Sequence, residues 1–200
     1  LSLLFSRMMA IIVRGSSLVA LLLIVSAYEI TALLKAEWSA AAVMMVWLGA
    51  YAFLRPLFDD GIGLLWAVGD TKKTAFIMGG QALLAAVLVP VLWSAYGIQG
   101  LCYAMAIVAG AGVCGVAKGV RDYVDLAWRN ILFAPFLALV VAALAALAYG
   151  HFAPSDWLWP NLVLRGICVT LAYGGILWIA EYRTLLRDWK HLRRIMREGG

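Results

Sequence analysis

Residues 132–149 read LFAPFLALVVAALAALAY, a run of eighteen residues that contains no charged side chain. An α-helix of this length rises about 27 Å, close to the ~30 Å thickness of the hydrocarbon core of a bilayer. Polar residues do not recur at helical spacing within it, as they would on the surface helix of a soluble protein. The stretch therefore predicts a helix that crosses a membrane.

Five other apolar segments of similar length fill most of the remaining chain. Together the six segments cover residues 16–34, 40–57, 75–93, 100–117, 132–149 and 162–180. Apolar residues make up 65% of the chain, charged residues make up 14%, and the mean hydropathy is +0.93, which is far from the balance of a globular protein. Because lipid satisfies no backbone hydrogen bond, we predict an all-α integral membrane protein with a lobe of six transmembrane helices over residues 16–180.

Lysine and arginine are distributed unevenly between the two predicted sides of the membrane. Thirteen of the sixteen lie in the N-terminal stretch, the turn at 69–74, the connection at 118–131 and the tail from 181. The connections on the other side carry only Lys35. The positive-inside rule therefore predicts a multi-pass protein with both ends of this segment in the cytoplasm. Anchoring to an anionic inner leaflet accounts for the net charge of +5, so no nucleic-acid partner is predicted.

The two ends of the chain carry different patterns from the crossings. Residues 1–15 place Arg7 and Arg14 opposite an apolar face and predict an amphipathic lead-in on the cytoplasmic surface. Residues 181–200 predict a separate basic amphipathic helix on that surface. The residues predicted to meet the membrane surface are Lys72, Lys73, Arg183, Arg187, Lys190, Arg194 and Arg197. Since the sequence opens LSLLFSRMMA without an initiator methionine, we expect the C-terminal part of a longer polytopic protein.

Sequence motifs for covalent chemistry are missing. The chain contains no HExxH, GxSxG or Walker motif and no pair of carboxylates at catalytic spacing. Its three cysteines lack CxxC spacing, and its only histidines are His151 and His191. The sequence therefore predicts no catalytic residue, no metal site and no cofactor, and we do not expect an enzyme.

The second crossing is unusual in its length and its charges. Residues 38–68 are mostly apolar and too long for one straight crossing, but Arg55-Pro56 and Asp59-Asp60 interrupt them. Proline removes a helical hydrogen bond and disfavours helical geometry in the residue before it. We predict a crossing over 40–58, a kink at Pro56 and an interfacial segment over 61–68. Arg55 and Asp59 are four residues apart, so they share a helix face.

The following motifs carry a family resemblance. The run RPLFDDGIGLLWAVGDTKKTAFI (residues 55–77) is followed by an apolar span and then by YGIQGLCYAMAI (96–107), and a W-x-x-A pattern (38–41) precedes them. Their order and spacing resemble the C-terminal half of bacterial polysaccharide and O-antigen flippases, which belong to the multidrug/oligosaccharidyl-lipid/polysaccharide flippase superfamily. The Gly-Asp-Thr-Lys turn at 69–72 is also similar to lipid II flippases. The resemblance covers residues 16–150.

The resemblance implies a function as well as a fold. Such transporters have two lobes of at least six helices, and only one lobe fits in this chain. The resemblance thus implies one lobe of an alternating-access transporter in the bacterial inner membrane, partnered by an N-terminal lobe. Its substrate would be a lipid-linked glycan, such as a precursor of O-antigen or lipopolysaccharide.

Charges inside the spans are the candidate site residues, because burying each costs about 2.5–3.5 kcal/mol. We predict substrate binding by Arg55 and Arg165, and ion coupling or charge pairing by Asp59 and Glu29. Other readings remain open: Arg55 could pair with Asp59, Arg165 could snorkel to headgroups, Glu29 could pair with Lys35, and Asp59 could lie in water.

Small and turn-forming residues complete the set of predictions. Pro56 is predicted as a hinge, and Gly69 and Asp70 as a tight turn. Thr71 or Thr74 is expected to cap the helix that follows, and Gly115-x-x-x-Gly119 is expected to let two helices approach closely.

Three other functions remain as alternatives. A multidrug extrusion antiporter of the same fold would be expected to have an acidic cavity, which Arg55 disfavours. A membrane enzyme that processes glycans or lipids would need a reactive cluster on the outer loops, where the sequence offers only His151 and Asp156. A structural membrane subunit would make the intramembrane charges dispensable.

Overall fold

The computed structural model describes residues 2–34, 36–124, 128–152 and 158–198, with side chains described for 5–34, 37–124, 131–151, 159–180 and 182. All regular structure in these residues is helical. The elements are α1 (Ser2–Val25), α2 (Ala27–Leu34), the 3-10 helix η1 (Ala36–Trp38), α3 (Ala41–Ala67), α4 (Thr71–Tyr96), α5 (Ile98–Val120), α6 (Trp128–Phe152) and α7 (Leu158–Glu198). Six helices contain a segment long and apolar enough to cross a membrane, which confirms the all-α fold class.

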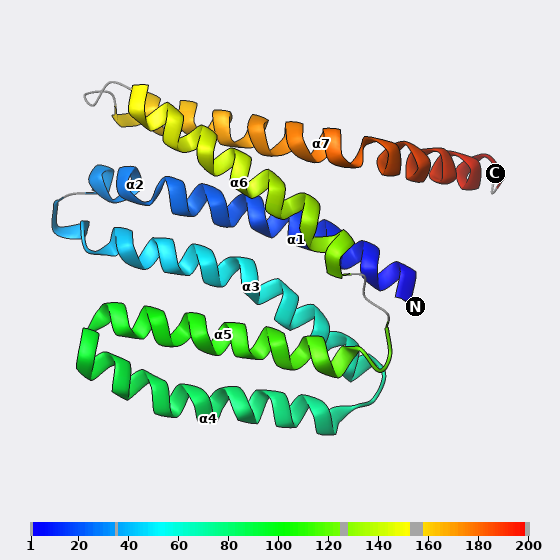
Figure 1. Cartoon of the computed structure of the whole chain (residues 1–200), viewed down its shortest axis with the longest axis horizontal. Helices are drawn as coiled ribbons and strands as arrows, with labels where there is room; N and C mark the ends of the chain where they lie inside the picture. The colour runs from blue at the N-terminus through cyan, green and yellow to red at the C-terminus, as the bar shows by residue number, and fades with distance from the viewer. Residues whose placement is uncertain (1, 35, 125–127, 153–157, 199–200) are drawn as a thin grey trace.

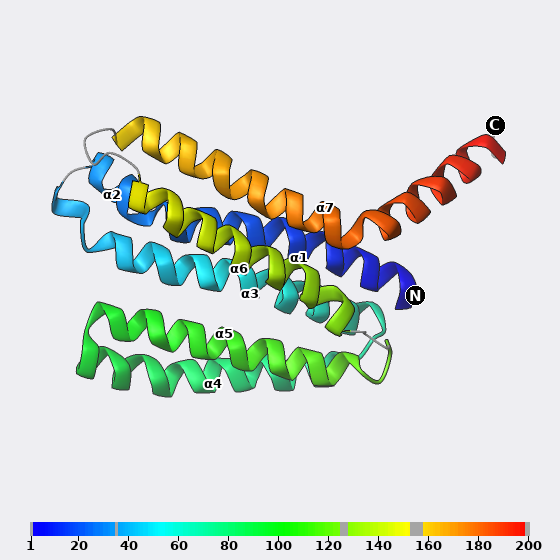
Figure 2. The same ribbon diagram turned by 45° about the horizontal axis from the view of Figure 1, so that its top comes forward.

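The long helices lie side by side in a row rather than around a central axis. From one edge to the other the order is α4, α5, α3, α1, α6 and α7, and each helix packs against its neighbour in that order. Helices α4, α5 and α3 follow one another in both views, whereas α6 crosses in front of α1 (Figures 1 and 2). The start of α1 and the end of α7 lie at the same end of the bundle along the helix axes, as expected for an even number of crossings (Figure 1).

The edge helices expose apolar side chains that would face water in a soluble protein. On α4, Phe76 is 84% exposed and Leu83 is 69% exposed, and Thr74 is the one buried residue of that helix. On α7, Leu171 and Ile179 are exposed to a similar degree. Large apolar surface on helices of this length is typical of contact with lipid or with another membrane-embedded body.

The interior of the row consists of three apolar clusters. One joins α3 to α5 through residues such as Leu65 and Val116. A second joins α1, α6 and α7 around Leu21 and Val169, and a third lies where α1, α3 and α6 meet at Met9. The predicted close approach at Gly115 is confirmed, because a Cβ there would lie 3.3 Å from Cγ2 of Ile77 on α4.

The first crossing differs from the predicted segment 16–34. The candidate span is Phe5–Val25, and the helix breaks at Ser26 before α2 begins. No break separates residues 2–15 from 16–25, and Met9 and Val13 in the predicted lead-in are buried. Residues 5–15 are apolar enough to belong to the span. The predicted segment starts too late because Arg7 and Arg14 are typical of a surface helix, although the apolar face beside them packs against α3 and α6.

The predicted interfacial segment over 61–68 does not form an element of its own. Helix α3 runs without interruption from Ala41 to Ala67, with Pro56 inside it. Residues after the proline remain in the helix because Ile62 and Leu65 are buried with Val116 and Val120 of α5. Tertiary packing therefore outweighs the lost hydrogen bond at the proline.

The predicted boundary at residue 181 is not a break in secondary structure. Helix α7 continues through it to Glu198, and its end projects past the neighbouring helices (Figure 2). The side chains of Arg183, Arg187, Lys190, Arg194 and Arg197 lie outside the described residues, so the predicted membrane-surface contacts of the tail stay predictions.

The orientation in the membrane gives a testable prediction. Because the cations gather at one end of the bundle, we expect the fusion sites after Lys73 and after Gly200 to lie in the cytoplasm. A reporter that is active only in the cytoplasm should therefore be active at both sites. A reporter inserted between residues 150 and 160 should be active only in the periplasm. Alkaline phosphatase and a fluorescent protein report the two compartments, and a cytoplasmic 150–160 connection would overturn the six-crossing topology.

Candidate functional site

The charged residues of α3 form a ladder along one helix face. Nε of Arg55 donates to Oδ2 of Asp59 at 2.7 Å, and Nη1 of Arg55 donates to the hydroxyl of Tyr51, also at 2.7 Å. The three residues are spaced four apart, which places them one above another on the helix. This confirms the predicted shared face of Arg55 and Asp59. Tyr51 was not predicted, although its position four residues before Arg55 is a signal visible in the sequence.

The ladder borders a cavity between three helices. The cavity measures about 140 Å³. It is lined by Tyr51, Leu54, Arg55 and Phe58 of α3, Gln81 of α4, and Met105, Val108 and Ala109 of α5. The side chains of Arg55 and Asp59 remain 53% and 50% exposed, so the ion pair leaves much of the guanidinium accessible. The arrangement offers a permanent cation at an otherwise mostly apolar cavity, a suitable place for an anionic group.

Gln81 closes one side of this cavity. Its Nε2 donates to the backbone carbonyl of Val108 at 3.0 Å, which ties α4 to α5. Gly112 makes this contact possible, because a Cβ at that position would overlap the Gln81 amide. The small size of Gly112 thus leaves room for a polar side chain between two membrane helices.

Arg165 and Glu29 form a second charged pair in another part of the fold. Nη1 of Arg165 on α7 bonds Oε1 of Glu29 on α2 and donates to the carbonyl of Val25 at 3.1 Å. Each side chain is only 19% exposed. The two residues are 136 positions apart in sequence, so neither spacing nor local pattern predicts their contact.

This pairing changes how two predicted site residues are read. Glu29 pairs with Arg165. The alternative pairing of Glu29 with Lys35 stays a prediction, because Lys35 lies outside the described residues. Arg165 is held inside the row instead of snorkelling to a headgroup. The predicted substrate-binding residues Arg55 and Arg165 therefore belong to two separate clusters.

Asp60, the neighbour of Asp59, has one buried carboxylate oxygen. Oδ2 of Asp60 accepts no hydrogen bond from any described residue. A buried carboxylate oxygen without a donor is costly, since ionised groups lose more on desolvation than neutral ones. Of the two carboxylates of α3, Asp60 is therefore the better candidate to bind a proton or a cation.

The turn between α3 and α4 is fixed by a network that reaches α5. Gly69 has a φ of +81°, a conformation that favours glycine, and Asp70 accepts a hydrogen bond from the backbone N–H of Lys73 at 3.1 Å. Asp70 is therefore the N-cap of α4, and the expected cap by Thr71 or Thr74 is wrong. The tight turn at Gly69 and Asp70 is confirmed.

Charges across the turn hold Lys73 in place. Its ammonium lies 2.7 Å from Asp122 and 3.1 Å from Asp70, and the hydroxyl of Tyr123 donates to Asp70 at 2.6 Å. The bonds from Tyr123 and from Lys73 lower the pKa of Asp70 to about 2, and the bond to Asp70 raises the pKa of Tyr123. Lys73 thus joins α4 to α5, whereas sequence reasoning had it meet lipid phosphates. Lys72, its neighbour, is exposed.

The part of the chain that the structure describes holds neither a cluster of metal ligands nor a disulfide bond. No group of three or more His, Cys, Asp or Glu residues there is placed to hold a metal ion. The cysteines at 102, 114 and 168 are free. Comparisons with protein-family models, with curated proteins and with solved structures gave no match.

Proposed function

We propose that this chain is the C-terminal lobe of a transporter that flips lipid-linked oligosaccharide or polysaccharide precursors across the bacterial inner membrane by alternating access. The observation that carries the proposal is Arg55, a half-exposed cation on a membrane-spanning helix beside a cavity. A lipid-linked glycan carries a phosphate or diphosphate, and a guanidinium binds two phosphate oxygens at once. The order of the flippase-like motifs along residues 16–150 supports the same function.

The shape of the fold supports a second lobe. Among the described residues, the helices form a single row except where α6 crosses α1, so most of the row has no second layer of helices against it (Figure 1). In alternating access, two such lobes rock about a site at their interface, and the substrate contacts change as they move. The lipid tail of the substrate would remain in the bilayer while the charged part passes the cavity. No covalent step is needed.

The proposal is tested by complementation. The full-length gene should restore surface polysaccharide to bacteria that lack their own flippase, and the lipid-linked precursor should cease to accumulate in the cytoplasmic leaflet. Surface glycan is measured by immunoblot, and precursor is measured by mass spectrometry of extracted lipids. Failure to restore export, with the protein present in the membrane, would contradict the proposal.

One observation favours a second candidate, a multidrug extrusion antiporter of the same superfamily. The unpartnered oxygen of Asp60 could bind H⁺ or Na⁺ during each cycle. An antiporter would extrude cationic drugs in a manner that depends on an ion gradient, and Asp60→Asn would uncouple it. A flippase would confer no drug efflux in the same cells, so an efflux assay with a fluorescent cationic dye separates the two functions.

Pro56 gives a prediction about movement. Pro56 directly follows Arg55 in α3 and has no N–H to donate to the carbonyl of Ala52. It therefore creates a point where the helix can bend. Pro56→Ala should restore that bond and stiffen the helix, and transport should fall although the protein is present at a normal level. Normal transport in the variant would mean that the proline only accommodates packing.

A further inference from the structure

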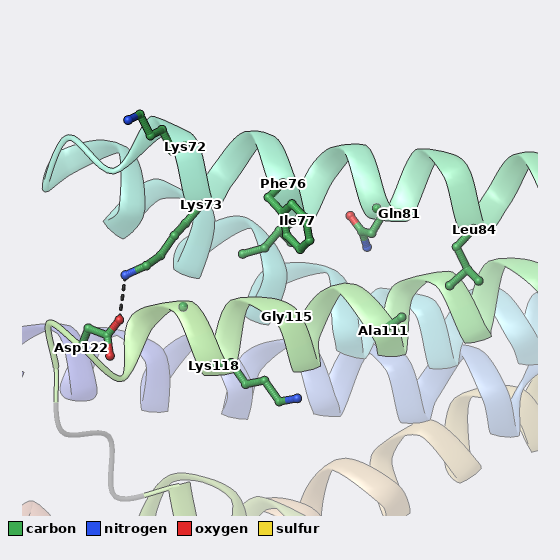
Figure 3. A pocket seen from close by; sticks show the side chains of 12 residues that line it. Lys72, Lys73, Phe76, Ile77, Gln81, Leu84, Ala111, Gly115, Lys118 and Asp122 are labelled. Carbon is green, nitrogen blue, oxygen red and sulfur yellow. Dashed lines mark hydrogen bonds and ion pairs between the residues drawn. The ribbon is translucent and has the colours of Figure 1, made fainter.

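A groove adjoining the Arg55 cavity runs between α4 and α5, and Gln81 lines both of them. It encloses about 670 Å³, within the range of pockets that bind small ligands (Figure 3). Gly80 of α4 and Ala111 and Gly115 of α5 keep it open, because none of them carries a large side chain. Phe76 and Leu84 of α4 add apolar surface along its length. The groove is therefore apolar for most of its length.

Charge is confined to one end of the groove. Lys72, Lys73 and Asp122 lie at that end, and Lys118 lies one turn before Asp122 on α5 (Figure 3). In this view the side chain of Lys72 points away from α5, and that of Lys118 points away from α4. The ammonium of Lys73 and the carboxylate of Asp122 form an ion pair, so their charges offset each other. Lys72 and Lys118 are exposed, and their side chains make no hydrogen bond or ion pair with the described residues. The groove thus combines an apolar channel with a cationic mouth.

The dimensions of the groove match one leaflet of a membrane. Lys72 and Leu84 are twelve residues apart on α4, which corresponds to about 18 Å of helix. Half of the hydrocarbon core of a bilayer is about 15 Å thick. With the lysines at headgroup level, the apolar part of the groove lies at the depth of the acyl chains of the same leaflet.

We propose that this groove binds an anionic phospholipid from the leaflet at its lysine end. One acyl chain lies between α4 and α5, against Phe76, Gly80 and Gly115. The phosphate lies at the lysine end, where the exposed side chains of Lys72 and Lys118 turn toward it. A protein helix would fill the apolar channel equally well, but it would also need acidic side chains at the lysine end. An anionic phospholipid supplies both chemistries in one molecule, and it surrounds every membrane-spanning helix. The site does not depend on the proposed transport function.

The test measures lipid binding to the purified, delipidated full chain. Dioleoylphosphatidylglycerol is titrated in detergent, and bound lipid is counted by native mass spectrometry. We expect one tightly bound molecule on the wild type. Each lysine contributes about fivefold in affinity, so Lys72→Gln with Lys118→Gln should weaken binding about 25-fold. Dioleoylphosphatidylcholine should bind more weakly and should not respond to the lysine replacements.

Two neighbouring glycines provide a matched test of the channel. Gly80→Leu places a side chain in the groove, whereas Gly79→Leu places the same side chain outside the groove lining. A Cβ at either position meets no atom within 4 Å, and leucine favours helix more than glycine does, so both variants should fold. Gly80→Leu should abolish tight binding, and Gly79→Leu should bind as the wild type does. Arg121→Gln, which removes an exposed cation beyond the groove lining, is the control for charge.

Several results would overturn the proposal. They are equal affinity for the two lipids, unchanged binding by Gly80→Leu, and equal loss in Gly79→Leu and Gly80→Leu. Inorganic phosphate at millimolar concentration should not displace the lipid, and full displacement would show a headgroup site without a chain site. If Gly80→Leu separates an oligomer while lipid binding persists, the occupant is a second copy and the lipid site is wrong.

Discussion

Export of the lipid-linked glycan should fall by about 10- to 100-fold when Arg55 is replaced by alanine in the full-length transporter. A hydrogen bond to a charged group contributes about 1.5–3 kcal/mol, and each 1.36 kcal/mol corresponds to a factor of ten. The guanidinium is half exposed at its cavity, so it can bind a phosphate without leaving the fold. The precursor should accumulate in the cytoplasmic leaflet, where extraction and mass spectrometry measure it.

Loss of the ion pair with Asp59 cannot explain a defect of that size. Pairs spaced four apart on an exposed helix face contribute about 0.3–0.5 kcal/mol, and Arg55 and Asp59 are both half exposed. Arg55→Ala should therefore reach the membrane at a normal level. Arg55→Lys should restore part of the export, because it keeps the charge but replaces a planar donor pair with a point charge. Arg121→Ala, which removes an exposed cation at the end of α5, should export normally.

Asp59 separates a substrate role from a pairing role. Asp59→Asn removes the partner of Arg55 but leaves the guanidinium beside the cavity. If Arg55 binds the substrate, Asp59→Asn should keep most of the export that Arg55→Ala loses. Equal loss in the two variants would mean that the ion pair itself is what matters. Normal export by Arg55→Ala, or loss only through degradation, would contradict the proposed cavity role.

Local features of the fold could be predicted from the sequence because local physics determines them. Six helices follow from hydropathy, since lipid leaves the backbone no other way to satisfy its hydrogen bonds. The contact between Arg55 and Asp59 follows from helical spacing, and the turn at Gly69 and Asp70 follows from residues that favour turns. Each of these predictions uses residues fewer than thirty positions apart.

Long-range contacts are the part that the sequence does not reveal. The continuation of α3 past Pro56 depends on α5, whose packing residues lie more than fifty positions away. The role of Lys73 depends on Asp122, and the first crossing begins early because Met9 packs against α3 and α6. Hydropathy measures how apolar a segment is, but it does not measure what the segment touches. The candidate site was therefore only partly predictable: Arg55 and Asp59 were found, whereas Tyr51, Gln81 and the buried oxygen of Asp60 were missed.

Thermal stability should respond most strongly to the pair formed by Glu29 and Arg165. Removing one partner of a fully buried ion pair costs about 3–5 kcal/mol, because the other charge stays buried without compensation. With both side chains 19% exposed, we expect about 2–4 kcal/mol for Glu29→Gln or Arg165→Gln. For a chain of this size the melting temperature should fall by about 5–15 °C. Tryptophan fluorescence of the purified protein during heating measures it.

The double variant and two matched variants decide whether the effect belongs to this pair. Glu29→Gln combined with Arg165→Gln should lose less stability than the sum of the single changes, because no uncompensated charge remains. Gly150→Ala should cause a smaller loss, since its Cβ would push the Arg165 guanidinium away from Glu29. Arg55→Ala removes a half-exposed pair and should change the melting temperature by no more than about 2 °C. If Arg165→Gln and Arg55→Ala lower the melting temperature equally little, Arg165 does not join α7 to the break between α1 and α2. That result would favour the predicted role of Arg165 in substrate binding.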